Sequence, residues 1–374
     1  MPAAKVSILL CVYNAASTLQ EAVDSILAQS FGDFELIIVD DGSIDGSAEL
    51  LAAYRDADKR VSVVTQRNVG MVGALNRGLA ACGGDYIARM DHDDRAWPDR
   101  LAHQIAYLDA NPAVVAVGGQ VRIIDATGKT RRLGQYPVGC SAVRNILSVS
   151  SPFAHPAVMM RRHGLLSVGG YRSAFEYAED YDLWLRLSEI GQLDNLPEIV
   201  LDYRWHGANV SALKAEAQAF ATAAAMIASR VRKTEGRDPF GELGRTVNMA
   251  DLAPYLRTAM EREQFDALVT NALTNNGGIL APGGVARTLR AIRSSATRGA
   301  ADLAVRAAYQ FFAARRHKDA AQVLAVAASR TPLAVARALV DRITTRRRET
   351  RRLAADLARN DLFRRMVSQN GPQA

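Results

Sequence analysis

Three groups of acidic residues in the first half of the chain could hold a cation and move a proton. Asp40-Asp41 and Asp91-His92-Asp93-Asp94 each follow a short apolar run, and Glu179-Asp180 stands farther along. Carboxylate oxygens are the ligands that Mg²⁺ and Mn²⁺ prefer. Such a cation can neutralise an anionic leaving group, and a carboxylate can act as a general base. The acidic first half of the chain therefore fits a site built from carboxylates that hold a cation.

Each motif also has a structural interpretation. An Asp-x-Asp occurs in many surface loops as a turn or a helix cap. An acidic pair such as Glu179-Asp180 can simply begin a helix, because the helix dipole favours negative charge there. The positions of the two aspartate clusters directly after predicted strands favour the functional interpretation.

Strand and helix patterns alternate through the first 210 residues, which predicts a mostly parallel sheet with helices on both faces. Such sheets bind ligands at the carboxyl ends of their strands. The two aspartate clusters should therefore meet at one edge of the sheet. The expected strands are Val6–Val12, Phe34–Val39, Val61–Thr65 and Asp85–Met90.

The strand pattern fades after about residue 210, and the remaining chain is rich in Ala, Leu and Arg at helical spacing. The expected fold class is therefore α/β, with a Rossmann-like, mostly parallel mixed sheet in a catalytic domain over residues 1–212. An α-helical, basic C-terminal region over residues 213–374 should follow it.

The charge is unevenly distributed. Residues 211–374 hold 27 lysines and arginines against 14 aspartates and glutamates, a balance of +13, although the whole chain carries only +7. The segment 342–365 alone has nine arginines. This half is either a solvated helical surface or a surface that contacts an anionic membrane. Nucleic-acid binding is not expected, because the segment lacks the repeated aromatic residues that stack on bases.

The cysteines and the N-terminus indicate a cytoplasmic protein. The three cysteines match no zinc, redox or disulfide spacing, which favours a reducing compartment. The apolar run that begins at Val6 ends at Asn14, so it predicts a buried strand rather than a signal peptide. No apolar stretch approaches the roughly 20 residues of a spanning helix. A peripheral position on the inner face of the cell membrane fits the basic C-terminal half.

The motifs, taken in order, resemble those of the family-2 glycosyltransferases, which have the GT-A fold. The resemblance spans about residues 5–211. The segments that carry it are Val6–Asn14, Ser25–Phe31, Phe34–Ser43, Asn68–Gly70, Ala74–Leu79, Asp91–Asp94, Glu179–Trp184 and Tyr203–His206.

The resemblance implies an inverting glycosyltransferase that takes a sugar from a nucleotide-diphospho-sugar, with a UDP-sugar as the expected donor. It also implies Mn²⁺ or Mg²⁺ as cofactor. The acceptor would be a glycan or a lipid-linked glycan in cell-envelope or polysaccharide synthesis.

The resemblance also implies roles on the donor side. Asp41 would accept a hydrogen bond from the nucleotide base, Asp91 would contact the ribose or the metal's water shell, and Asp93 would bind the metal directly. His206 would complete the metal site. The remaining expected nucleotide-sugar contacts are Cys11, Val12, Tyr13, Asn14, Asn68, Gly70, Asn76 and His92.

On the acceptor side, Asp180 matches the family's catalytic base, and Glu179 would assist it or orient the acceptor. Trp184 lies four residues later on the same helix face, where it could raise the pKa of Asp180 and contact the acceptor. His155 falls near the acceptor in the family, and a structural histidine is equally compatible with its position.

Other functions are less compatible with the sequence. A non-catalytic nucleotide-sugar-binding scaffold on the same fold would be expected to lose the metal ligand or the base, yet Asp93 and Asp180 are both present. A nucleotidyltransferase should have a Gly-rich loop after the first strand, where residues 12–15 contain no glycine. A nicotinamide-dependent dehydrogenase is not expected either, because no G-x-G-x-x-G motif follows the first strand.

Overall fold

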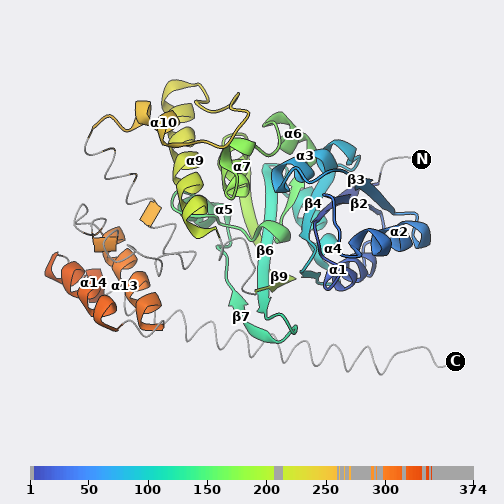
Figure 1. The fold of residues 1–374 in the computed structure, drawn as a ribbon, viewed down its shortest axis with the longest axis horizontal. Coiled ribbons are helices and arrows are strands. Elements are labelled where there is room, and N and C mark those ends of the chain that lie inside the picture. The colour runs from blue at the N-terminus through green and yellow to red at the C-terminus, as the bar shows by residue number, and fades with distance from the viewer. Residues whose placement is uncertain are drawn as a thin grey trace.

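The computed structural model describes residues 4–205 and 214–258, together with parts of 261–338. Within these residues the chain forms one mixed sheet of nine strands in the order β3-β2-β1-β4-β8-β6-β9-β5, with β7 paired to β6. Helices cover both faces of the sheet (Figure 1). The predicted α/β class is therefore correct.

The first four strands form the parallel half of the sheet. Every residue of β1 is buried, and β2 and β4 are nearly so, as expected for strands that are covered on both faces. Their register runs continuously from β3 through β2 and β1 to β4. The strands are β1 (Val6–Val12), β2 (Phe34–Asp40), β3 (Val61–Thr65) and β4 (Tyr86–Asp91).

The other half of the sheet is mixed. The short β8 pairs antiparallel with both β4 and β6, whereas β6 and β9 run parallel to each other. The strands of this half are β5 (Arg95–Ala96), β6 (Val114–Ile124), β7 (Thr130–Gly134), β8 (Met159–Arg161) and β9 (Gln192–Arg204).

The alternation of side chains along β1 divides the core into two layers. Ile8 and Leu10 face α1 and α4, whereas Leu9 and Cys11 face α3 and α7. The helices of the first 190 residues are α1 (Leu19–Leu27), α2 (Ser47–Ala57), α3 (Met71–Ala81), α4 (Arg100–Ala110), α5 (Cys140–Leu147), α6 (Arg162–Ser167) and α7 (Glu179–Leu187), with the 3₁₀ turns η1 (His155–Ala157) and η2 (Ser173–Phe175).

The helix α9 (Ala215–Glu235) packs against α7, and its alanine-rich face belongs to the same core layer as α3 and α7 (Figure 1). The segment after α9 returns to the sheet domain. There Arg172 Nη1 pairs with Asp238 Oδ2 at 2.6 Å, and the Val247 amide donates to the Ala174 carbonyl at 3.0 Å. The predicted boundary at residue 212 falls in 206–213, outside the described residues.

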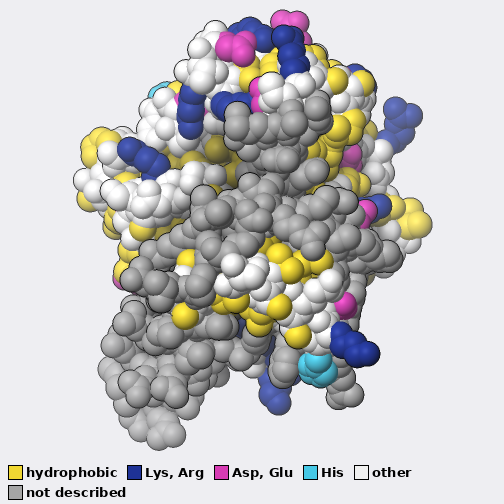
Figure 2. All heavy atoms as spheres, turned by 90° about the vertical axis from the view of Figure 1, so that its left-hand side faces the viewer, with side chains coloured by type: hydrophobic (Ala, Val, Ile, Leu, Met, Phe, Trp, Pro, Cys, Tyr) yellow, Lys and Arg dark blue, Asp and Glu magenta, His cyan; other side chains and the backbone are white. Residues whose placement is uncertain are grey.

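Farther along lie α10 (Met249–Leu252), η3 (Ala253–Tyr255), α13 (Arg298–Ala313) and α14 (His317–Arg330), of which α13 and α14 pack on each other around Phe311 and Val323. On the face seen in Figure 2, most of the described Lys and Arg side chains lie toward the top of the view, where Asp and Glu side chains stand among them. The Arg-rich segment 342–365 lies outside the described residues. No helix in the described part of the chain is both long enough and apolar enough to cross a membrane.

Candidate active site

The register of the central strands brings the two aspartate clusters to one edge of the sheet. Cys11 on β1 lies opposite Val39 on β2 and opposite Asp91 on β4, and Val12 lies opposite Asp40. The chain leaving β2 and the chain leaving β4 therefore flank the end of β1. This is the arrangement that the alternation of strands and helices predicts.

Asp41 anchors the loop before α3. Its buried carboxylate accepts hydrogen bonds from Gln66 Nε2 at 2.8 Å and from the amides of Val69 and Gly70, each at 3.0 Å. Gly70 has a φ of 84°, in the left-handed region that favours glycine. A nucleotide base would have to share this carboxylate with three protein donors, so the predicted contact with Asp41 stays a prediction.

The end of β1 offers mainly backbone groups to a ligand. The side chains of Cys11 and Val12 are buried, and burial raises the pKa of the Cys11 thiol to about 12, so it is neutral. Tyr13 is half exposed. Asn14 has a φ of 53°, and its Oδ1 accepts from the Ile44 amide at 2.9 Å, which ties the β1 loop to the β2 loop.

Three carboxylates gather after β4. Ligand oxygens of Asp91, Asp93 and Asp94 lie within 4.8 Å of one another. Asp94 is 1% exposed; its Oδ1 accepts from the Arg204 amide at 2.7 Å, and its Oδ2 has no hydrogen-bond partner among the described residues. Burial, then repulsion from Asp91 and Asp93, raises the pKa of Asp94 well above its usual range. A buried carboxylate oxygen without a donor fits a divalent cation at this place.

Asp94 was not predicted as a metal ligand, although its position next to the Asp-x-Asp pair could have suggested it. His206, the predicted third ligand, lies outside the described residues. His92 is half-buried, and its Nδ1 has no hydrogen-bond partner in the described chain.

Glu179 and Asp180 are the first two residues of α7. Asp180 Oδ1 accepts from the Tyr181 amide at 2.7 Å. Burial raises the pKa of Asp180, whereas that hydrogen bond and the positive charge of Arg89 lower it. Burial, followed by repulsion from Asp180, raises the pKa of Glu179 to about 7. Two neighbouring carboxyls whose pKa values are both raised by burial are suited to proton transfer.

Trp184 lies one helical turn after Asp180 on α7. It is fully buried, with its ring 5.1 Å from Phe153 and 5.8 Å from His155, both edge-on. It therefore forms part of the apolar surroundings of α7, but the predicted effect on Asp180 is not borne out, because the Trp184 side chain lowers the pKa of Asp180 rather than raising it. The predicted acceptor contact of Trp184 is not supported, because a side chain without exposed surface cannot touch a second substrate.

His155 is half-buried, and its Nε2 lies 3.0 Å from the Tyr171 hydroxyl. Burial, together with the charge of Arg89, holds the pKa of His155 well below its usual range, so the ring is neutral. Its contact with Tyr171 and its packing on Trp184 are compatible with the structural role that the sequence left open. The predicted acceptor contact stays a prediction.

Sequence reasoning missed three residues that lie among the carboxylates. Arg89 Nη1 lies 2.5 Å from Asp91 Oδ2. Tyr203 lies near Asp94 and Asp91, and burial followed by these charges raises its pKa. Tyr136 lies near Asp180 and Asp94. A signal for Arg89 did exist, because arginine is rarely found inside a buried strand unless it is paired.

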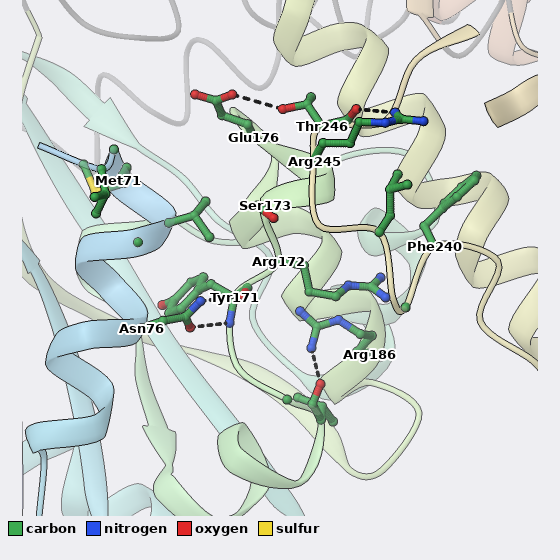
Figure 3. Close-up of a pocket in the computed structure, with 18 of the residues that line it drawn as sticks. Met71, Asn76, Tyr171, Arg172, Ser173, Glu176, Arg186, Phe240, Arg245 and Thr246 are labelled. Atoms are coloured by element: carbon green, nitrogen blue, oxygen red, sulfur yellow. Dashed lines mark hydrogen bonds between the residues drawn. The ribbon is translucent and has the colours of Figure 1, made fainter. Parts of the chain in front are cut away.

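A cavity of about 870 Å³ lies beside α3 (Figure 3). Residues 69–76, 168–176 and 238–246 form most of its wall. Asn76 lines it, but its Nδ2 donates to the Tyr171 carbonyl at 2.8 Å and its Oδ1 accepts from the Tyr171 amide at 3.0 Å. Since both ends of the amide are occupied, Asn76 shapes this wall. Asn68 is exposed on the preceding loop.

Comparison with known proteins agrees with this geometry. The sequence profile of "Glycosyl transferase family 2" matches residues 7–169. The O-antigen biosynthesis glycosyltransferase WbnJ of Escherichia coli is 36% identical over 205 residues, which are 54% of this chain and 80% of WbnJ. The chain belongs to glycosyltransferase family 2. The amylovoran biosynthesis glycosyltransferase AmsE of Erwinia amylovora is 33% identical over 202 residues, 53% of this chain and 75% of AmsE.

Two solved structures resemble this family-2 glycosyltransferase in fold. The mannosyltransferase PcManGT of Pyrobaculum calidifontis, solved with GDP-Man and Mn²⁺, has a TM-score of 0.52 at 20% identity, with 88% of each chain covered. Residues 1–349 of S. aureus TarS, solved with UDP-GlcNAc, have a TM-score of 0.51 at 16% identity, with 86% of this chain and 90% of that chain covered. The predicted GT-A fold is thereby confirmed.

Proposed function

We propose that this glycosyltransferase inverts the anomeric carbon of a UDP-sugar and needs Mn²⁺ or Mg²⁺. The observation that carries the proposal is the group formed by Asp91, Asp93 and Asp94, in which one buried carboxylate oxygen has no donor among the described residues. The names of WbnJ and AmsE support a glycan or lipid-linked acceptor in polysaccharide or O-antigen synthesis.

On the donor side, the three carboxylates would hold the cation. When bound, it would supply positive charge to the diphosphate as the bond to the sugar breaks. Asp41 holds the loop of Val69 and Gly70 in place, and the backbone of residues 11–14 and 68–70 would line the nucleotide pocket. The side chains of Cys11 and Val12 are buried, so this wall would offer backbone groups to the nucleotide.

On the acceptor side, Asp180 would take the proton from the attacking hydroxyl. The acceptor oxygen forms its bond to the anomeric carbon from the face opposite the diphosphate, and the diphosphate leaves with the electron pair of the broken bond. Burial raises the pKa of Asp180, which brings it nearer to neutral pH and makes it a more effective base. Glu179, with a pKa of about 7, would orient the acceptor or relay a proton.

The proposal is tested by thermal melting of the full chain with UDP-glucose, UDP-N-acetylglucosamine, UDP-galactose, GDP-mannose and a sugar-free UDP control, each with Mn²⁺, with Mg²⁺ and with EDTA. A ligand at a hundred times its dissociation constant stabilises by about 2.7 kcal/mol, which gives a shift of several degrees. We expect UDP and at least one UDP-sugar to raise the Tm only with a divalent cation. Stabilisation by GDP-mannose alone would overturn the UDP assignment, and full stabilisation in EDTA would overturn the cation.

Residues 213–374 are proposed to be a helical region that holds the enzyme at the inner face of the membrane through its Arg-rich end. The excess of 27 basic over 14 acidic residues in 211–374 supports this. Sedimentation with phosphatidylglycerol vesicles tests it. Binding should weaken as salt increases, and binding that persists after removal of residues 342–374 contradicts a role for that segment.

A further inference from the structure

The carboxylates proposed to hold the cation lie on a short stretch of chain. Strand β4 ends at Asp91 and β5 begins at Arg95, so residues 92–94 form the loop between them. The sheet fixes both ends of this loop, since Asp91 lies opposite Cys11 on β1 and Arg95 lies opposite Asp202 on β9. Carboxylates whose oxygens lie within 4.8 Å of one another repel. The middle of the loop must therefore be held by other groups.

Arg204, the last residue of β9, binds this loop at two places. Its Nε donates to the carbonyl of Asp93 at 2.7 Å, and its own amide donates to Oδ1 of Asp94, also at 2.7 Å. Only 4% of the Arg204 side chain is exposed, so the guanidinium lies largely away from water. Charge-assisted hydrogen bonds are strong in such surroundings. One residue therefore holds both the backbone of Asp93 and the side chain of Asp94.

The guanidinium of Arg204 is itself fixed by two other segments. Nη2 donates to Oε2 of Glu21 on α1 at 2.6 Å, and Nη1 donates to the carbonyl of Ala126 at 3.1 Å, between β6 and β7. Each of the three nitrogens thus has an acceptor on a different segment, which restricts the planar group to one orientation. Glu21 also supplies the negative charge that a buried guanidinium needs. Arg204 consequently ties the loop 92–94 to α1 and to the β6–β7 turn.

We propose that Arg204 is a positioning residue whose guanidinium holds the loop 92–94 in the shape that receives the cation. It acts through the Asp93 carbonyl and touches neither the cation nor the substrate. This role rests on the proposed cation site, because only there does the shape of the loop have a chemical consequence. Groups that support a metal ligand from outside typically change the affinity 10–100-fold. Loss of the guanidinium should therefore weaken cation binding, although it removes a positive charge.

Binding of Mn²⁺ alone to the full chain, followed by its electron paramagnetic resonance signal, tests this role. Arg204→Met should weaken Mn²⁺ binding by at least about tenfold. Electrostatics alone predicts the opposite, because removal of a positive charge near three carboxylates favours a cation. The amide of residue 204 can still donate to Asp94 in this variant, so the substitution isolates the guanidinium. Unchanged or tighter Mn²⁺ binding by folded Arg204→Met would overturn the proposal.

Arg204→Lys separates the shape of the guanidinium from its charge. Lysine keeps the positive charge but presents its donors from one nitrogen instead of three. It should therefore still bind Mn²⁺ several-fold more weakly than the native chain. Native affinity in Arg204→Lys would show that charge is sufficient and would contradict the positioning role. If Arg204→Met does not fold, the comparison is made with Arg204→Lys, for which native affinity is again the contrary result.

Arg122→Met is the matched control. Arg122 lies on β6, which pairs with β9, and its side chain is 14% exposed. Its Nε and Nη2 bind the carboxylate of Asp202 on β9 at 2.7 and 2.6 Å, whereas Arg204 binds the loop 92–94. Arg122→Met should lower the Tm and still bind Mn²⁺ as the native chain does. An equal loss of Mn²⁺ binding in the two variants would mean that affinity merely follows stability, against the proposal.

Amide hydrogen exchange of the ligand-free chain distinguishes failure of this role from failure of the cation site. The loop 92–94 should exchange faster in Arg204→Met than in the native chain or in Arg122→Met, because it has lost its anchor. Native-like exchange of the loop, in a chain whose native form binds Mn²⁺, refutes the positioning role alone. If the native chain binds no Mn²⁺, the proposed cation site fails, and the role of Arg204 fails with it.

Discussion

Asp180→Asn should reduce the rate of sugar transfer by about a thousandfold, with binding of UDP and Mn²⁺ within about twofold of the native enzyme. General-base catalysis contributes roughly 10²–10⁴ in rate, and an amide cannot accept the proton of the acceptor hydroxyl. The substitution keeps the size of the side chain and the bond that Oδ1 accepts from the Tyr181 amide. Transfer kinetics and calorimetric titration with UDP and Mn²⁺ measure the two effects separately.

Glu179→Gln is the control for this prediction, because Glu179 is the adjacent carboxyl on α7. This substitution should lower the rate by no more than about tenfold, well below the range for a general base. The native rate should fall on the acidic side as Asp180 takes up a proton, at a pH above that of an ordinary aspartate, because burial raises its pKa. Asp180→Asn should lose this acidic limb. If Glu179→Gln has the larger effect, the roles of the two residues are reversed.

Asp93→Asn should weaken binding of UDP in the presence of Mn²⁺ by at least about tenfold, with no change in EDTA. Loss of groups that merely support a metal ligand costs 10–100-fold in affinity, and a direct ligand should cost no less. The stabilisation by UDP with Mn²⁺ should largely disappear. Calorimetry with UDP, with and without Mn²⁺, makes the measurement.

Asp85→Asn provides the matched control. Asp85 directly precedes β4, at the opposite end from Asp93, and its side chain is 76% exposed near Lys5. It should bind UDP with Mn²⁺ as the native chain does. If Asp93→Asn binds UDP with native-like affinity in the presence of Mn²⁺, Asp93 is not a ligand of the cation. Asp91 and Asp94 would then be the carboxylates that hold the cation.

The part of the site that depends on local pattern could be predicted from the sequence. Apolar runs located β1, β2 and β4 to within a residue or two, acids follow two of these runs, and parallel strands must end at one edge. The convergence of Asp41 and Asp91 beside the end of β1 follows from that rule alone.

The parts that depend on distant pairing could not be predicted. Nothing in the three-residue β8 indicates that it inserts antiparallel between β4 and β6, yet this pairing brings η1 against β4. The burial of Trp184 could not be predicted either, because a tryptophan on an amphipathic helix can face either the solvent or the core. The surroundings of Asp94 also depend on a distant segment. The Arg204 amide, at the end of β9 and more than a hundred residues later, donates to Oδ1 of Asp94, and Oδ2 has no hydrogen-bond partner among the described residues.

The cavity beside α3 and the acidic edge of the sheet are formed by different parts of the chain. The acidic edge of the sheet lies almost wholly within residues 7–169, the part that matches the family profile. Two walls of the cavity, 168–176 and 238–246, come from the end of that part or from beyond it. Contacts such as Arg172 with Asp238 fasten the later wall to the earlier one. A change in the later segment could therefore alter the shape of the cavity and leave the carboxylates proposed to hold the cation in place, whereas Asp180, the proposed base, lies between the two walls in the sequence.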